Sequence, residues 1–305
     1  MRTGLLFSGQ GAQHVGMAKS LYDQAPQAAR IFDQANAILG YDLKTACFEG
    51  PEETLTRTNY CQPALYVHGV CVYELLKERG CLEDLHCVLG LSLGELTALA
   101  IAGVYDFETG LRIVAERGRL MEEACAQSEG GMACLIGGTP EEAKTLAQDC
   151  DVDLANFNSP GQIVLSGDKA KIDTAVEKAE ALSFKRVVPL NVAGAYHSRL
   201  MEPAREAFAS FLSDIPFAAP TITVFTNTTG LAIQEPEAIK AALTKQVVSS
   251  VLWEDCFRNA RALGVDTFYE CGPGKVLAGL ARRTEKSSTV IPVSEYTDLP
   301  EGVST

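Results

Sequence analysis

The stretch "VLGLSLGELTAL" (residues 88–99) places Ser92 between Gly90 and Gly94, where an apolar run changes into a helical pattern. A G-x-S-x-G sequence between a strand and a helix is typical of a nucleophile elbow, in which the glycines let the backbone bend tightly around the serine. The amides at the start of the helix would then face any oxyanion formed at that serine. A plain helix N-cap uses the same residue type, so both interpretations of Ser92 stay open at this point.

Length and charge limit the class of protein. At 305 residues the chain is at the upper limit for one hydrophobic core, which predicts a large domain together with a smaller one. The net charge of −13 argues against nucleic acid and anionic membranes as the main partners, because phosphate binding needs a positive field. A small anionic substrate needs only one local cation and is still allowed.

The sequence shows no targeting signal and no membrane span. The stretch "MRTGLLFSGQG" lacks the features of a secretory signal, since Ser8 and Gly9 interrupt its apolar run. The longest apolar stretch, around "LTALAIAGVY", is far shorter than the roughly 20 residues that cross a bilayer. We therefore expect a cytoplasmic protein without a membrane partner.

Ten cysteines raise the question of disulfides or a metal site. They include no C-x-x-C pair, and no histidine cluster lies at metal-ligand spacing. Reduced, mostly buried thiols that pack as small hydrophobic groups are the better interpretation. We expect no bound metal.

The two ends of the chain predict one α/β domain. "TGLLF" (3–7) and "HCVLG" (86–90) read as short buried strands, and the helical pattern "PALYVHGVCVYELLKERG" between them stops at Gly80. After Asn191 helical and strand patterns alternate again up to "TVIPV". Short apolar strands separated by helices predict a mainly parallel sheet.

The middle of the chain has a different rhythm. A strand at 131–137 is followed by a helix capped at Thr139, two strands joined by the "NSPG" turn, a second helix and a last strand. The order β-α-β-β-α-β is the ferredoxin-like unit. We predict a small domain over 128–191, inserted into a discontinuous large domain formed by 1–127 and 192–305. A cleft between two such domains is a usual place for a ligand.

A serine nucleophile needs a base, and the chain has four histidines. His68 lies in the middle of a helix on a core-like pattern, His86 begins a strand, and His14 follows the first glycine-rich turn, from which it could line the site. His197 lies on the irregular segment "NVAGAYHSRLM" between a strand and a helix, where site residues often project. This position favours His197, although a lone histidine is more often a hydrogen-bonded structural residue.

Six stretches now fall into a known order. "FSGQGAQHVGM", "GLSLGEL", "ERGRLM", "NFNSPGQIVLSG", "GAYHSRLM" and "FYECGPGKVLAGL" together resemble the malonyl-CoA:acyl carrier protein transacylase family, which includes the acyltransferase domains of fatty acid and polyketide synthases. The resemblance covers residues 3 to about 292. It implies a large hydrolase-like α/β domain with a mainly parallel sheet and an inserted ferredoxin-like domain.

The resemblance also implies the catalytic residues. Ser92 matches the nucleophile that takes the acyl group, and His197 matches its base. The family orients this histidine through a main-chain carbonyl, here that of Gln246, which agrees with the lack of an obvious acid for a triad. Gln10 and Leu93 match the two residues whose backbone N–H groups form the oxyanion hole.

The acyl-binding residues follow in the same way. Arg117 matches the arginine that grips the malonyl carboxylate, and a guanidinium can hold a carboxylate through two parallel hydrogen bonds. Without the resemblance, a surface arginine paired with Glu116 or Glu122 would be the preferred interpretation. Asn158 matches a residue near the bound acyl chain on the small domain.

Three positions depart from the usual family pattern. Leu91 stands before the serine where relatives have His, and Ser8 stands where proline is frequent. Tyr196 stands before the catalytic histidine where relatives carry Phe or Ser. A bulky residue there goes with malonyl in the family, so Tyr196 favours malonyl, whereas Leu91 leaves the shape of the acyl pocket open.

The implied reaction is a ping-pong acyl transfer from malonyl-CoA through Ser92 to the phosphopantetheine thiol of acyl carrier protein, without a metal or another cofactor. We expect it to supply fatty acid synthesis; a free-standing polyketide acyltransferase is the alternative. Acidic carriers require a basic docking face, and its candidates, which could also be ordinary solvated charges, are Lys185, Arg186, Arg282 and Arg283.

Two rival functions are weaker. An α/β-hydrolase or thioesterase would normally carry an HGGG-type oxyanion loop and an acid between the serine and the histidine in chain order. The sequence has no HGGG, and its first glycine-rich loop lies before the serine. A non-catalytic carrier-binding protein would be expected to lack one member of the Ser–His pair, and both are present.

Overall fold

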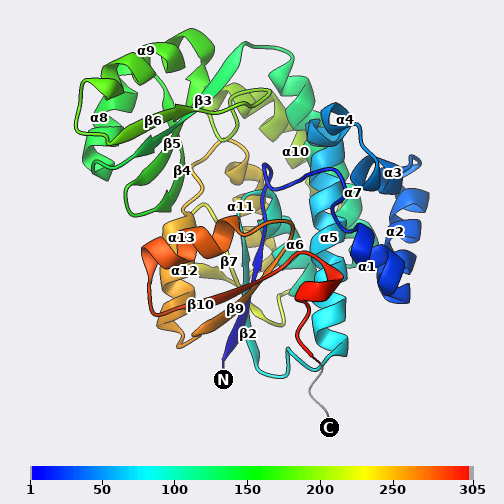
Figure 1. The fold of residues 1–305 in the computed structure, drawn as a ribbon. Helices are drawn as coiled ribbons and strands as arrows, with labels where there is room; N and C mark the ends of the chain where they lie inside the picture. The colour runs from blue at the N-terminus through cyan, green and yellow to red at the C-terminus, as the bar shows by residue number, and fades with distance from the viewer. Residues whose placement is uncertain (1, 302–305) are drawn as a thin grey trace.

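The computed structural model describes residues 2–301, which form an α/β fold with two sheets (Figure 1). The larger sheet has the strand order β10-β9-β1-β2-β7-β8, and its strands are parallel except for β8, which runs antiparallel to β7. The strands are β1 (Thr3–Phe7), β2 (Leu85–Gly90), β7 (Thr223–Phe225), β8 (Ala232–Ile233), β9 (Thr267–Cys271) and β10 (Thr289–Val293). The mainly parallel sheet is as predicted; β8 was not predicted, because two residues are too few to form a pattern.

Both faces of this sheet are buried. Leu5 and Phe7 of β1 point into a core with the helices α5, α6 and α7, whereas Leu6 points into a second core with α12 and α13. Alternate side chains of a strand lie on opposite faces, so a continuous apolar run marks a strand covered on both sides. The helices of this part are α1 (Lys19–Gln24), α2 (Pro26–Leu39), α3 (Leu43–Phe48), α4 (Glu52–Thr56), α5 (Thr58–Glu78), α6 (Leu93–Ile101), α7 (Phe107–Cys125), α10 (Glu202–Ser213), α11 (Pro236–Gln246), α12 (Trp253–Ala262) and α13 (Val276–Thr284), with 3-10 turns at Arg199–Met201 and Tyr296–Asp298.

Helix α5 begins five residues before the predicted start at Pro63. Proline has no N–H, so it leaves the carbonyl four residues earlier without its helical partner. That carbonyl belongs to Asn59, and it accepts a hydrogen bond of 3.1 Å from the Tyr41 hydroxyl. The helix therefore continues through Pro63, because a side chain distant in sequence replaces the lost donor.

The smaller sheet has the order β4-β5-β3-β6, and every neighbouring pair is antiparallel. It consists of β3 (Gly130–Ile136), β4 (Asp153–Ser159), β5 (Gln162–Asp168) and β6 (Arg186–Pro189), with α8 (Pro140–Cys150) and α9 (Lys169–Glu180) packed against it. Thr139 caps α8 in a reciprocal capping box with Glu142. The predicted fold class is confirmed, including the ferredoxin-like strand order; the exact limits of the two domains stay a prediction.

The small sheet is joined to the large one along the free edge of β4. The N–H of Phe157 donates to Val251 O at 2.9 Å, and the N–H of Val251 donates to Ala155 O at 2.8 Å. Val251 lies between α11 and α12, two helices that belong to the part of the chain around the larger sheet. The small domain is therefore attached through main-chain hydrogen bonds close to the end of α11, at Gln246.

Three further observations concern the expected class of protein. All ten cysteines lie within the described part of the chain; none is in a disulfide, and all except Cys81 are buried, as predicted. Over residues 2–301, no cluster of three or more His, Cys, Asp or Glu side chains could hold a metal ion. No helix in that range is both long and apolar enough to span a bilayer.

Candidate active site

Ser92 lies at the bend between β2 and α6, with φ 53° and ψ −102°. A non-glycine residue at positive φ is strained, and such residues concentrate at functional sites. The glycines on either side are required by close packing: a Cβ built at Gly90 would lie 1.9 Å from the carbonyl carbon of Gly94, and one built at Gly94 would lie 2.1 Å from Phe7 O. The Ser92 side chain makes no capping hydrogen bond to α6, so the structure does not support the plain N-cap interpretation.

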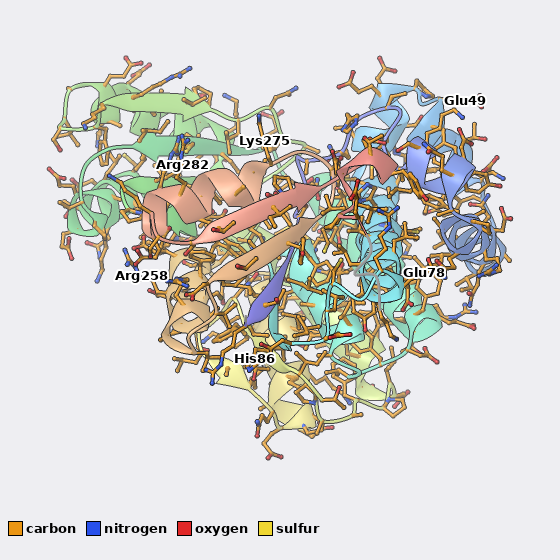
Figure 2. All side chains as sticks on the ribbon, turned by 60° about the horizontal axis from the view of Figure 1, so that its bottom comes forward. Glu49, Glu78, His86, Arg258, Lys275 and Arg282 are labelled. Atoms are coloured by element: carbon orange, nitrogen blue, oxygen red, sulfur yellow. The ribbon has the colours of Figure 1, made fainter. Side chains whose placement is uncertain are left out.

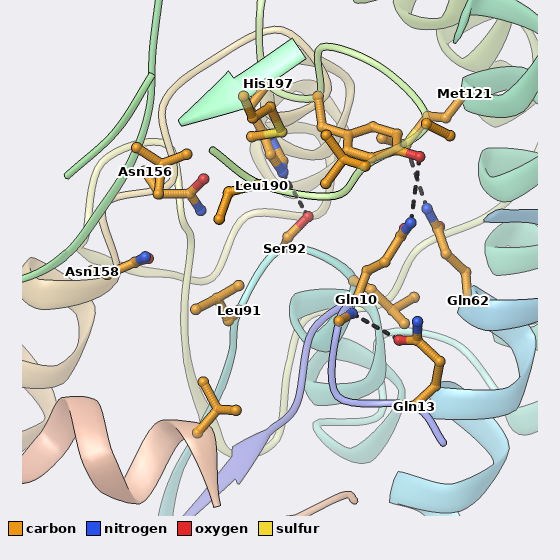
Figure 3. Close-up of a pocket in the computed structure, with 18 of the residues that line it drawn as sticks. Gln10, Gln13, Gln62, Leu91, Ser92, Met121, Asn156, Asn158, Leu190 and His197 are labelled. Atoms are coloured by element: carbon orange, nitrogen blue, oxygen red, sulfur yellow. Dashed lines mark hydrogen bonds between the residues drawn. The ribbon is translucent and has the colours of Figure 1, made fainter. Parts of the chain in front are cut away.

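The Ser92 hydroxyl is paired with one histidine. Ser92 Oγ lies 2.7 Å from Nε2 of His197 (Figure 3). Nδ1 of the same ring lies 2.8 Å from the main-chain oxygen of Gln246. A carbonyl accepts hydrogen bonds only, so Nδ1 carries the proton and Nε2 is left to accept the Ser92 proton. Burial and the nearby charge of Arg117 lower the pKa of His197 to about 4, so the imidazole is neutral at pH 7.

The other histidines lie elsewhere. His68 is fully buried within α5, His86 is in β2 and partly exposed, and His14 is exposed. Of the four, only His197 contacts Ser92. Burial also lowers the pKa of His68 to about 4. Between about pH 6.5 and pH 4, His68 and His197 are protonated in the unfolded chain but neutral in the folded protein. The free energy of unfolding therefore falls as the pH drops through that range.

Arg117 reaches the same hydroxyl from α7. Its side chain is 1% exposed, and Nη2 donates to Ser92 Oγ at 3.2 Å and to the side-chain oxygen of Gln246 at 2.8 Å. Nη1 donates to the side-chain oxygen of Gln62 at 2.8 Å. Nε has no protein partner within the described residues. All of its hydrogen-bond partners are uncharged, so the guanidinium is available to an incoming carboxylate.

The surface interpretation of Arg117 is wrong. Glu116 pairs with Arg119, and Glu122 pairs with Arg57. One turn of α7 therefore directs its acidic residues to the exterior while Arg117 points inward. The local sequence alone had favoured a surface position for Arg117, and only the family resemblance pointed to a role in the site.

Sequence reasoning missed a buried acid and two amides. Glu95 is 2% exposed, and its Oε2 accepts from the Gln246 side-chain amide at 2.6 Å and from the Asn227 N–H at 3.0 Å. Burial raises the pKa of Glu95, and these hydrogen bonds oppose that shift. Asn227 Oδ1 also accepts the N–H of Ser92 at 2.7 Å. A carboxylate within the apolar stretch "LGELTALAI" was a visible signal for Glu95; Gln62 and Asn227 had no local signal.

Ser92 faces a cavity of about 480 Å³ between the two domains. Figure 3 shows Asn158 on one side of the serine, with Gln10 on the other and Leu91 below. The buried Tyr196 hydroxyl lies 2.8 Å from Thr58 Oγ1 and accepts from the Gln10 side chain at 3.4 Å. The side-chain oxygen of Asn158 is buried, and no group in the described part of the chain is hydrogen-bonded to it. The residues that the sequence predicts for the acyl pocket therefore all line one cavity: Leu91, Arg117, Asn158 and Tyr196.

The two amides expected to form an oxyanion hole lie at the same cavity. Gln10 follows β1, and Leu93 is the first residue of α6. In the part of the chain that the structure describes, neither main-chain N–H is bonded to a protein acceptor. Free N–H groups at a helix start and in a glycine-rich turn are suited to a developing negative charge.

The four basic docking candidates are exposed but do not form one group. Arg282 and Arg283 lie at the end of α13, and Arg283 donates a hydrogen bond to Gln162 of β5. Figure 2 shows Arg282 and Lys275 along α13, beside the small domain. Lys185 and Arg186 lie at β6, which is the edge of the small sheet opposite to β4. A single partner would have to span the small domain to contact both pairs.

A strained serine, a buried histidine and an inward-facing arginine at one cavity of an α/β fold define an acyltransferase. The chain belongs to the acyl transferase domain family, whose model matches residues 5–301. It is 39% identical over 299 residues to the malonyl CoA-acyl carrier protein transacylase of Bacillus subtilis (strain 168), covering 96% of this chain and 94% of the relative. It is 40% identical over 292 residues to the polyketide biosynthesis malonyl CoA-acyl carrier protein transacylase PksC of the same organism, covering 94% and 98%. The crystal structure of an acyl carrier protein S-malonyltransferase from Vibrio cholerae O1 biovar eltor is similar with a TM-score of 0.94 and 37% identity, covering 98% of this chain and 99% of that one.

The geometry makes a prediction about His197. Its imidazole should titrate at about pH 4, which NMR of the ring C–H signals against pH would measure. Arg117→Met should raise this pKa, because a nearby cation disfavours the imidazolium; burial will still keep it below 6.5. Arg119→Met removes an exposed cation from the same helix and should leave it in place. A pKa near 6.5 in the unmodified protein, or equal shifts in both variants, would contradict the assignment.

Proposed function

We propose that this enzyme transfers the malonyl group of malonyl-CoA to the phosphopantetheine thiol of acyl carrier protein through a covalent malonyl–Ser92 intermediate. One observation carries the proposal: Ser92 Oγ lies 2.7 Å from a neutral histidine nitrogen and 3.2 Å from a buried guanidinium. The first group can accept the serine proton, and the second can bind a carboxylate attached to the acyl group. The names of the similar proteins from Bacillus subtilis agree with malonyl as that group.

In the first half-reaction His197 Nε2 takes the Ser92 proton while Oγ attacks the thioester carbonyl. The carbonyl oxygen becomes negative and is stabilised by the free N–H groups of Gln10 and Leu93. The carbon–sulfur bond then breaks, the CoA thiolate takes the proton from His197, and malonyl–Ser92 remains. The main-chain oxygen of Gln246 keeps the imidazole oriented throughout.

The second half-reaction runs in reverse with a different thiol. His197 accepts the proton of the carrier's phosphopantetheine thiol, and the sulfur attacks the ester carbonyl of malonyl–Ser92. The Ser92–acyl bond breaks, and Oγ recovers its proton from His197. The first product leaves before the second substrate reacts, which is ping-pong kinetics. No metal or resident cofactor takes part.

Malonyl is selected by charge and shape. Arg117 provides the cation that a carboxylate needs in a mostly apolar cavity. Tyr196 is fixed by its hydrogen bonds and limits the width of the pocket. Leu91 replaces a polar residue with an apolar wall, and Asn158 lies on the small-domain side, near the acyl chain.

We assign the product to fatty acid synthesis in the cytoplasm. A free-standing polyketide acyltransferase is the second candidate, because the polyketide relative is as similar to this chain as the first one, at 40% against 39% identity. Both candidates use the same site chemistry and differ only in the carrier that accepts malonyl.

The intermediate is tested by mass spectrometry of the intact protein after brief mixing with malonyl-CoA. We expect one malonyl adduct, absent in Ser92→Ala, and acylation about 100- to 10,000-fold slower in His197→Ala, the usual effect of losing a positioned base. His14→Ala is the control, since His14 is exposed. A stable adduct on another residue would rule out Ser92. An adduct that water releases as fast as the carrier would favour the hydrolase alternative.

The role of Arg117 is tested by comparing two thioesters. Removing one partner of a buried ion pair costs about 3–5 kcal/mol, or roughly 100- to 4000-fold in kcat/KM. Arg117→Ala should lose malonyl transfer by about this factor, whereas the slow acylation by acetyl-CoA, which makes no such contact, should persist or rise. Equal losses for the two thioesters would mean that Arg117 supports the fold or the CoA moiety instead.

We also propose that the acidic carrier docks against Arg282 and Arg283, with Lys185 and Arg186 as a second, separate pair. Reversing Arg282 and Arg283 to Glu should raise the KM for the carrier, and weaken its salt dependence, while acylation by malonyl-CoA continues. The double reversal at Lys185 and Arg186 is the matched comparison. Unchanged carrier kinetics in the first variant would remove α13 from the docking face.

A further inference from the structure

The side chain of Gln246 forms hydrogen bonds to several residues of the site. These bonds are separate from the one that the main-chain oxygen of Gln246 makes to His197. The side chain is fully buried, and its Oε1 accepts from Arg117 Nη2 at 2.8 Å. Its Nε2 donates to Glu95 Oε2 at 2.6 Å and to the main-chain oxygen of Ser92 at 3.1 Å. Nε2 also donates a longer bond to Asn227 Oδ1 at 3.5 Å. A donor therefore faces Oε1 and three acceptors face Nε2, so the amide has one possible orientation.

This amide lies between two buried ionisable side chains. Glu95 and Arg117 are 2% and 1% exposed, and within residues 2–301 each is hydrogen-bonded to the Gln246 amide and not to the other. A carboxylate bound directly to Arg117 would occupy the N–H groups that a malonyl carboxylate needs. Glu95 holds the neutral amide, and the amide in turn orients the guanidinium, which has no acidic side chain in direct contact within the described residues.

We propose that the Gln246 side chain, held by Glu95, is a positioning residue that keeps Arg117 aligned and unpaired, so that the site takes malonyl in preference to uncharged acyl groups. The inference rests on the proposed function and deepens it. It assigns selectivity to a residue that need not touch the substrate. Its physical basis is that a cation can be oriented by a neutral acceptor and yet keep its charge for a ligand.

Side-chain variants of Gln246 test this without removing the main-chain oxygen that orients His197. Gln246→Glu places a carboxylate oxygen where Oε1 contacts Arg117, and this oxygen competes with malonyl. It also brings two acids together, so one of them keeps a proton. We expect the ratio of malonyl-CoA to acetyl-CoA acylation, each as kcat/KM, to fall at least about tenfold. The malonyl loss should lie mainly in KM, because the competing group acts on binding.

Gln246→Met removes all the side-chain hydrogen bonds of residue 246 without adding charge, and it keeps the test open if Gln246→Glu does not fold. Arg117 then loses one of its two amide acceptors and keeps Gln62, so the malonyl-to-acetyl ratio should fall by a smaller factor, roughly three- to tenfold. The control is Tyr66→Phe, which loses another buried hydrogen bond, of 3.1 Å to Phe107 O, away from the cavity. It should lower the melting temperature without moving the ratio.

The double variant Glu95→Gln/Gln246→Glu exchanges the acid and the amide and keeps the net charge. If Glu95 and Gln246 support only the fold, this exchange should return both the malonyl-to-acetyl ratio and the melting temperature to the values of the unmodified protein. We expect the ratio to stay low, because the acid now contacts Arg117. A ratio within twofold of the unmodified protein in folded Gln246→Glu or Gln246→Met, or a restored ratio in the exchange, would overturn the inference. An unmodified protein that forms no malonyl adduct would instead overturn the proposed function.

Discussion

The carbonyl oxygen of Phe7, at the end of β1, is the contact around which the site is built. The N–H of Leu91 donates to it at 3.1 Å, and a Cβ at Gly94 would lie 2.1 Å from it. Helix α6 can therefore begin close to the central strand only if residue 94 is glycine. The backbone bends sharply at Ser92, which adopts a positive φ as a result. Main-chain packing, rather than any interaction of its own side chain, aims the serine at the cavity.

The second constraint is the burial of charge. Arg117 is almost completely buried, which lowers the pKa of its guanidinium to about 10 and still leaves it charged at pH 7. A buried cation that contacts only neutral groups is costly for the empty protein, even with Glu95 on the far side of the Gln246 amide. In the proposed reaction, the carboxylate of the acyl group removes that cost on binding, which would give the site its preference for anionic acyl groups.

The histidine is oriented by a carbonyl instead of a carboxylate. No negative charge stabilises the imidazolium directly, which agrees with the low pKa of His197. A base with a pKa of about 4 is weak, so it is effective only in a reaction that needs little help from a base. A thiol is a far better leaving group than an amine, so thioester exchange makes smaller demands on the base than amide hydrolysis does. The absence of a triad acid is therefore consistent with acyl transfer between thiols.

Local sequence was enough for much of the fold and for one part of the site. The elbow at Ser92, the strands on both sides of the chain and the ferredoxin-like order follow from apolar runs, glycines and helix caps, because those signals act between residues close in the chain. The local pattern favoured a surface position for Arg117, paired with Glu116 or Glu122. Resemblance to a family, and not periodicity, selected Arg117 for the site.

Tertiary structure alone brought together Gln62, Glu95, Asn227 and Gln246 around Ser92 and Arg117. These residues lie on separate helices and loops. An isolated amide or acid in a sequence does not indicate which distant residue it will form a hydrogen bond with. Their arrangement depends on hydrogen bonds between groups up to 154 positions apart. Such bonds form only after the two sheets and their helices have packed, because burial is what makes each buried polar group require a partner.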